Sequence, residues 1–147
     1  MEARMQNPMF GVDGAMDIAT AMQKVLTRQD TSIDLEWISL RASQINGCTW
    51  CLDMHSKALL KAGQPQEKLF HLPGWRDSVH FDDAERAALA LTEAVTRLSD
   101  QSDAVPDAVW EEAADQFSEE ELGLIVLQIA AINFFNRINV TIRQVTG

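Results

Sequence analysis

The sequence predicts an all-helical protein that forms a single domain over residues 1–147. Apolar residues recur at spacings that suit helices, no period-two alternation is sustained, and no Asn-Gly hairpin separates two apolar runs. With 147 residues, 46% of them hydrophobic, the chain can bury one core and has little room for a second.

Two helices are predicted before the cysteines. The first runs from Ala15 to about Arg28, where apolar residues form one stripe. The second begins after Thr31 or Ser32, since both residue types favour the N-cap. It ends at Asn46-Gly47, a pair suited to the left-handed turn that terminates helices.

A third helix is predicted from about Cys48 to Ala62. Gly63 suits the position after its C-cap, and Pro65 cannot continue the helix from Gln64. Residues 71–75 then form a connector.

A fourth helix is predicted after Asp82, which with Glu85 resembles a capping box. Its apolar residues form one stripe: Ala84, Ala87, Ala88, Leu91, Ala94, Val95 and Leu98.

Two more helices complete the chain. Pro106 suits a first helical position, which predicts a short helix toward Phe117. Ser118 and Glu121 form an S-x-x-E capping box, and the helix after it extends as far as Val145. This helix is apolar nearly all round over residues 122–135, so we expect it to be both the central core helix and part of a subunit interface.

Composition restricts the partners. The net charge is −10 and no Lys/Arg cluster occurs, so nucleic acid is not expected to bind. The first residues contain no apolar stretch that could form a signal-peptide core, which predicts a cytoplasmic protein. The longest apolar run, residues 122–135, falls short of the roughly 20 residues that span a bilayer, so no membrane partner is expected.

The two cysteines, Cys48 and Cys51, are the most informative feature. In a reducing compartment a pair at this spacing is more often catalytic or metal-binding than a structural disulfide. At about 100° per residue, Cys48, Cys51 and His55 point into an arc of roughly 60° on one helix face. The first turn of a helix also favours a thiolate over a thiol.

Glu36 is the candidate fourth member of this site. If the second and third helices fold back on each other around Gly47, Glu36 faces a position near Lys57, one turn beyond His55. A carboxylate that orients an imidazole, which handles the proton of a thiol, is the general arrangement of an activated nucleophile.

Other interpretations of these residues stay open at this point. The cysteines could be ordinary buried residues, or zinc ligands with His55 and with His71 or His80 as the fourth. Glu36 could be a solvated residue or a partner for Arg41. Trp50 could line a pocket or pack in the core.

The pattern Glu36-x11-Cys48-x-x-Cys51-x-x-x-His55 resembles the signature of the carboxymuconolactone decarboxylase-like superfamily, in its alkylhydroperoxidase AhpD branch. The resemblance extends over nearly the whole chain: residues 40–48 and 51–56, Trp75-Arg76, Phe81, residues 85–89, Phe117-Ser118 and Asn136-Arg137.

This resemblance implies a helical subunit, with a helix hairpin carrying the C-x-x-C, that assembles into homo-oligomeric trimers or hexamers and reduces hydroperoxides. It implies that Cys51 attacks the peroxide, that Cys48 supplies a proton and closes the disulfide, and that Glu36 and His55 relay protons. An external dithiol recycles the pair, and no cofactor or metal is expected. AhpD carries a histidine directly before the second cysteine, where this chain has Trp50.

Three functions therefore follow from the sequence. The first is a hydroperoxide reductase with an antioxidant role, whose chemistry needs an ionised thiol, an acid and a second thiol. The second is a lyase acting on a lactone, which has no evident use for a disulfide. The third is a non-enzymatic redox sensor or metal-binding protein.

Overall fold

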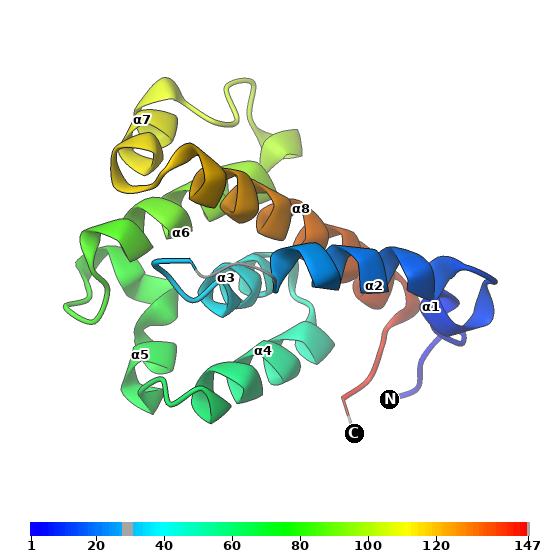
Figure 1. The fold of residues 1–147 in the computed structure, drawn as a ribbon. Coiled ribbons are helices and arrows are strands. Elements are labelled where there is room, and N and C mark those ends of the chain that lie inside the picture. Colours follow the sequence, from blue (N-terminus) through cyan, green and yellow to red (C-terminus); the bar gives the residue numbers. More distant parts are fainter. Residues whose placement is uncertain (28–30, 147) are drawn as a thin grey trace.

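The computed structural model describes residues 1–27 and 31–146, and within these residues it contains helices and no strand, as the sequence predicts (Figure 1). The elements follow in this order: α1 (Pro8–Gly11), α2 (Ala15–Leu26), α3 (Glu36–Asn46), α4 (Thr49–Lys61), α5 (Gln66–His71), the 3-10 helix η1 (Leu72–Asp77), α6 (Asp83–Thr96), the 3-10 helix η2 (Leu98–Asp100), α7 (Asp107–Gln116) and α8 (Glu119–Ile142).

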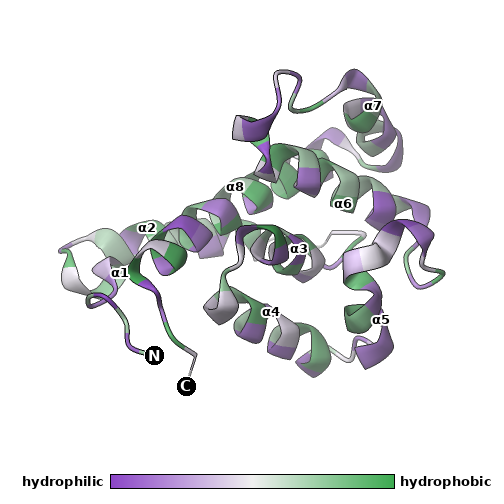
Figure 2. Ribbon diagram, turned by 180° about the vertical axis from the view of Figure 1, so that it is seen from behind, coloured by the Kyte–Doolittle hydropathy of each residue, from purple (hydrophilic) through white to green (hydrophobic). Residues whose placement is uncertain are grey.

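Helix α8 is the central element, because it packs against α2, α3, α4, α6 and α7. The main core lies between α3, α6, α7 and α8 and centres on Ile38, Leu91, Ile125 and Ile129. In Figure 2 the hydrophobic turns of α6 and α8 lie side by side. The predicted role of α8 as the core helix is thus confirmed.

By length and composition α8 is also apolar enough to cross a membrane, the one such helix among the described residues. The apolar run over residues 122–135 alone is too short for this, but α8 extends well beyond it, to 24 residues. In this fold, however, α8 packs against five other helices.

Two predicted capping boxes are present. Asp82 accepts from the Glu85 amide while the Glu85 side chain accepts from the Asp82 amide, and Ser118 and Glu121 do the same at α8. Because these local bonds satisfy free helix amides, they fix the starts of α6 and α8.

The second predicted helix begins later than expected, at Glu36 rather than after Thr31 or Ser32. Asp34 Oδ1 accepts from the Glu36 amide at 3.0 Å and Thr31 Oγ1 bonds Ile33 O at 2.6 Å. The Ser32 amide donates to Glu121 Oε1 at 3.0 Å, which ties this segment to the start of α8.

Other boundaries differ by a few residues. Helix α2 ends at Leu26, and the predicted end at Arg28 lies outside the described residues. Pro106 is the N-cap of α7 rather than its first helical residue. Helix α8 stops at Ile142, short of Val145, because Arg143 adopts a left-handed conformation (φ 55°). Neither α1 nor α5 was predicted, and residues 71–75 form part of α5 and η1 rather than an irregular connector.

One buried carboxylate joins α3, η1 and α6. Glu93 accepts from Arg41 Nε, Trp75 Nε1 and Arg76 Nη2, each at 2.8 Å. Burial raises the pKa of Glu93, but the hydrogen bonds from Arg76, Trp75 and Arg41 outweigh it and lower this pKa from 4.5 to about 2. This pairing fixes α3, which carries part of the candidate site.

The N-terminal segment lies beside the end of α8 (Figure 1). The Arg4 amide donates to Ile142 O at 2.8 Å, and Asn7 Nδ2 donates to Asn139 Oδ1 at 3.2 Å and to Gln144 Oε1 at 3.3 Å. The N-terminal segment is therefore attached to the last turn of α8.

Candidate active site

The cysteine pair sits at a sharp turn between α3 and α4. Gly47 caps α3 in the left-handed conformation (φ 67°), which costs glycine little. Cys48 follows in an extended conformation as the N-cap of α4, and its amide donates to Ser43 O at 3.0 Å. The predicted helix start is thus confirmed to within one residue.

Asparagines hold this turn against α8. Asn46 Nδ2 donates to Asn133 Oδ1 at 3.0 Å and to Asn136 Oδ1 at 2.9 Å. Asn136 Nδ2 donates in turn to Ser43 Oγ at 3.1 Å. Because each buried amide finds partners, this polar contact both stabilises the α3–α8 packing and fixes where α4 begins.

Cys48 and Cys51 form a disulfide, with their Cα atoms 5.3 Å apart. Both residues are almost fully buried and pack against Ala42 of α3 and Ile132 of α8. The Cys51 amide donates to Cys48 Sγ at 3.4 Å. Cys48 therefore receives a free amide of the first helical turn, which favours negative charge on its sulfur once the pair is reduced.

Glu36 contacts His55 directly, with Oε2 2.6 Å from Nδ1. The sequence placed Glu36 opposite a position near Lys57, but Lys57 pairs with Asp53 on its own helix. Arg41, the alternative partner of Glu36, is bound to Glu93 instead. The carboxylate–imidazole pair is thus closer than the sequence predicted.

The second ring nitrogen of His55, Nε2, is buried and has no hydrogen-bond partner among the residues that the structure describes. His55 and Cys51 lie one turn apart on the same face of α4 and line the same cleft, as does Glu36. The candidate proton relay and the candidate nucleophile therefore line the same cleft.

This cleft has a volume of about 1150 Å³ and lies between α2, α3, α4 and α8. Apolar side chains dominate near the sulfur, including Trp50, Met54 and Phe135. Trp50 is 38% exposed, so it lines the cleft rather than packing in the core.

Asn139 is a site residue that the sequence analysis missed. Its Nδ2 donates to Cys51 Sγ at 3.4 Å, across 88 positions of sequence. The signal was the series Asn133, Asn136 and Asn139, which places polar groups at helical spacing on an otherwise apolar helix.

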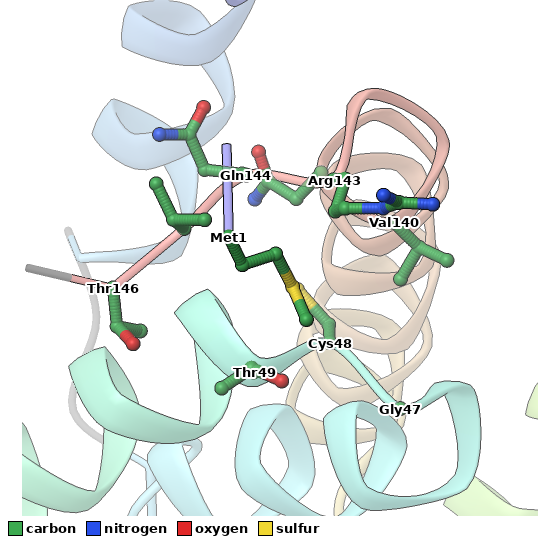
Figure 3. A pocket seen from close by; sticks show the side chains of 10 residues that line it. Met1, Gly47, Cys48, Thr49, Val140, Arg143, Gln144 and Thr146 are labelled. Atoms are coloured by element: carbon green, nitrogen blue, oxygen red, sulfur yellow. The ribbon is translucent and has the colours of Figure 1, made fainter. Parts of the chain in front are cut away.

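The two cysteines line different openings, although both openings are also lined by Asn139 and Gln144. Cys51 lines the large cleft, whereas Cys48 lines a second pocket of about 440 Å³. Figure 3 shows this pocket, with Cys48 and Thr49 from the start of α4 beneath Val140 and Arg143 from the end of α8. Asn139 lines both openings.

The alternative of a zinc site finds no support in this geometry. Among residues 1–27 and 31–146, no three His, Cys, Asp or Glu side chains gather as a metal site would require. His71 bonds Ser78 at 3.1 Å and contacts His80, with their ring centroids 4.6 Å apart.

Comparison with known proteins gives a consistent result. The model of the "Carboxymuconolactone decarboxylase family" matches residues 15–94. The uncharacterized protein YdfG of Bacillus subtilis is 35% identical over 105 residues, 71% of this chain and 70% of that protein. The uncharacterized protein YnjA of Escherichia coli is 30% identical over 102 residues, 69% of this chain and 54% of that longer protein.

A solved structure matches nearly the whole chain. It is a protein of unknown function from Agrobacterium tumefaciens, for which an antioxidant defence role of the AhpD kind has been suggested. Its TM-score is 0.89 at 31% sequence identity, and the match covers 99% of each chain.

Proposed function

Since the chain belongs to the carboxymuconolactone decarboxylase family, in its AhpD-like branch, we propose that it is a thiol-dependent hydroperoxide reductase with an antioxidant role. Cys51 is the attacking thiol, Cys48 the resolving thiol, and Glu36 with His55 the proton relay. An external dithiol restores the reduced pair.

One observation carries this proposal. Glu36 holds Nδ1 of His55 at 2.6 Å, the buried Nε2 of the same ring has no hydrogen-bond partner among the described residues, and His55 and Cys51 line one cleft. A carboxylate in this position fixes the orientation of the ring, so that Nε2 is held in place as the proton donor of the proposed relay. The alkoxide that leaves when the O–O bond of the hydroperoxide breaks needs such a proton donor.

The first step consumes the peroxide. The Cys51 thiolate attacks the terminal oxygen of the hydroperoxide, so that an S–O bond forms and the O–O bond breaks. The alkoxide leaves and takes a proton from His55, which yields an alcohol and a sulfenic acid on Cys51. The hydrogen bond from Asn139 to Cys51 Sγ supports the attacking thiolate, because bonds to charged sulfur are stronger than bonds to neutral sulfur.

The second step closes the disulfide that the structure contains. Cys48 Sγ bonds Cys51 Sγ, and the hydroxyl of the sulfenic acid leaves as water with the Cys48 thiol proton. The Cα atoms are 5.3 Å apart, within the range that a disulfide requires, so no large backbone movement is needed. Rapid closure protects Cys51 from irreversible oxidation.

Trp50 replaces the histidine that AhpD carries before the second cysteine. An indole cannot relay a proton, so His55 alone serves as acid in this proposal. The indole instead gives the cleft an apolar wall, which favours organic hydroperoxides with an apolar tail.

We place the activity in the cytoplasm, where a reducing environment keeps dithiols available. We also propose a homo-oligomer. The support is helix α2, none of whose described residues is buried although Met16, Ile18 and Val25 are apolar. Light scattering of the purified protein would measure the assembly, and a monomer would contradict this part.

A lyase is the competing proposal, because the family takes its name from a decarboxylase. A decarboxylation has no use for a second thiol that closes a disulfide. Under that proposal Cys48→Ser would leave turnover unaffected, whereas a peroxide cycle that closes this disulfide loses its resolving step in the same variant.

The test is hydroperoxide consumption by reduced protein with dithiothreitol as donor, followed with cumene hydroperoxide and with hydrogen peroxide. We expect catalytic consumption that Cys51→Ser abolishes. Equal rates for the wild type and Cys51→Ser, after subtraction of the uncatalysed reaction, would show that the proposal is wrong.

A further inference from the structure

We propose that the pocket lined by Cys48, rather than the cleft lined by Cys51, is the binding site of the reductant, and that it takes a thiol carrying a carboxylate. This inference rests on the proposed function, since it concerns the recycling half of the same cycle.

The first argument is the separation of the two openings. Cys51 lines the large cleft and is absent from the pocket, whereas Cys48 lines the pocket and is absent from the cleft. Asn139 lines both openings, and its Nδ2 donates to Cys51 Sγ. An oxidant and a reductant can thus reach the pair without competing for one space.

The second argument is the chemistry of thiol–disulfide exchange. Of the two cysteines, a thiolate in the pocket can reach only the one that lines it, Cys48, and attack on Cys48 Sγ displaces Cys51 Sγ. The S–S bond breaks, and its electron pair stays on Cys51 as a thiolate that accepts from Asn139 Nδ2. A stabilised leaving thiolate departs faster.

A second thiolate then completes the reduction. It attacks the reductant's sulfur in the mixed disulfide, and the electron pair of that bond passes to Cys48 Sγ. This sulfur accepts from the Cys51 amide at the start of α4. In total two thiols are oxidised to one disulfide, and the protein disulfide is reduced to two thiols.

The third argument is charge. Among the described residues that line the pocket, Arg143 carries the charged side chain, and no carboxylate accompanies it. The protein has a net charge of −10, so its overall charge repels an anionic reductant. The guanidinium of Arg143 attracts such a reductant locally. The large cleft differs, since two carboxylates, Asp34 and Glu36, line it beside one cation, Lys24.

The backbone at Arg143 also supports a binding role. It has a left-handed conformation (φ 55°, ψ 53°), which is uncommon for arginine at a position that usually takes glycine. The turn is closed by the Gln144 amide, which donates to Asn139 O at 2.8 Å. After this turn, residues 144–146 line one part of the pocket. The volume, about 440 Å³, suits a small molecule or a thiol on a flexible arm.

The test uses the oxidised full-length protein without peroxide, so its outcome does not depend on peroxidase activity. Three thiols of similar size serve as probes: 3-mercaptopropionate (anionic), 2-mercaptoethanol (neutral) and cysteamine (cationic). Samples are quenched with acid, alkylated and digested, and fragmentation of tryptic peptide 42–57 locates the adduct. We expect the mixed disulfide on Cys48, and an adduct on Cys51 would overturn the proposed route.

Variants of Arg143 test the charge. We expect Arg143→Gln to slow reduction by 3-mercaptopropionate about threefold relative to wild type, with 2-mercaptoethanol unaffected and cysteamine unchanged or faster. Arg143→Lys keeps the charge and the wild-type pattern. Lys24→Gln, which removes a cation that lines the other cleft, is the matched control and leaves all three rates unchanged.

An equal loss with all three thiols in Arg143→Gln would assign the residue a structural role only, as a cation that stabilises the end of α8. Either that result or no change with the anionic thiol would contradict the carboxylate preference. A protein that shows the Cys48 adduct but consumes no hydroperoxide would retain the reductant site and refute the proposed peroxidase.

Discussion

The side-chain amide of Asn139 donates a hydrogen bond to Cys51 Sγ over 3.4 Å, and this contact connects the end of α8 to the candidate nucleophile. Asn139 Oδ1 accepts from Asn7 at the same time, which fixes which end of the amide faces the sulfur. The donor is therefore oriented before the disulfide opens.

Replacement of Asn139 by leucine should lower the reactivity of Cys51. Leucine has a similar volume but cannot donate, so the thiolate loses one charge-assisted hydrogen bond. We expect iodoacetamide to alkylate Cys51 about tenfold more slowly at neutral pH. The measurement uses the Cys48→Ser background, in which Cys51 is the sole thiol. Arg137→Leu, exposed on the same helix, is the control and should react at the parent rate.

Cys48→Ser should separate the two steps of the cycle. Without a resolving thiol, Cys51 reacts once with cumene hydroperoxide and stays as a sulfenic acid. We expect one equivalent of peroxide to be consumed per chain and the product to be trapped by dimedone, as mass spectrometry would record. Full catalytic turnover by this variant would contradict a role for Cys48.

Glu36→Gln should reduce peroxidase activity without unfolding the protein. The Glu36 side chain is 37% exposed, so its charge is not needed in the core. The neutral amide loses the charge-assisted hydrogen bond to His55 Nδ1 that orients the ring, and we expect kcat/KM to fall about 10- to 100-fold. Glu67→Gln, a carboxylate of α5 outside the cleft lining, serves as the control. Loss of less than twofold would remove Glu36 from the relay.

Trp50→Ala should discriminate between substrates. The indole supplies apolar contact area in the cleft, and its removal weakens binding of bulky hydroperoxides. We expect KM for cumene hydroperoxide to rise about 5-fold while kcat/KM for hydrogen peroxide stays within twofold. A parallel loss for both substrates would mean that Trp50 acts on the cysteines rather than on the substrate.

The paired carboxylate of Glu93 should make stability depend on acid pH. The folded pKa is about 2, against an ordinary value of 4.5, so its stabilising contribution is present above pH 4.5 and is lost as the pH falls toward 2. The full contribution is about 3 kcal/mol. Denaturant unfolding of wild type and Glu93→Gln should therefore differ most near neutral pH, and the difference should shrink by that amount in acid. A constant difference would contradict the assignment.

Local sequence signals predicted much of the fold. The capping boxes at Asp82 and Ser118 and the turn at Gly47 act through neighbouring residues, and each lies where the sequence put it. The predicted start of α3 was wrong: the Ser32 amide is bound by Glu121 of a distant helix, and the chain turns into α3 only after Asp34, whose side chain accepts from the Glu36 amide. A contact that spans 89 positions leaves no local signal.

In the candidate site, too, local sequence predicted some features, whereas others depend on how distant helices pack. Cys48, Cys51 and His55 are related by helix geometry, which spacing alone defines. The Glu36–His55 contact depends on how α3 and α4 cross, so the sequence predicted the pairing but not its register. Asn139 approaches from α8, and only the packed structure brings it to the sulfur. The roles of these residues in catalysis stay predictions that the variants above address.

The attachment of Asn7 and Arg4 to the last turn of α8 connects the environment of the cysteines to fraying of the chain ends. Termini open locally far more often than a whole protein unfolds. An opening of this kind would break the hydrogen bond from Asn7 that holds the Asn139 amide toward Cys51. We therefore expect a measured thiol reactivity to be an average over closed and open ends, weighted by an equilibrium that temperature shifts. A bulky affinity tag fused directly before residue 1 would shift that average as well, so rates measured on tagged protein describe a different population of ends.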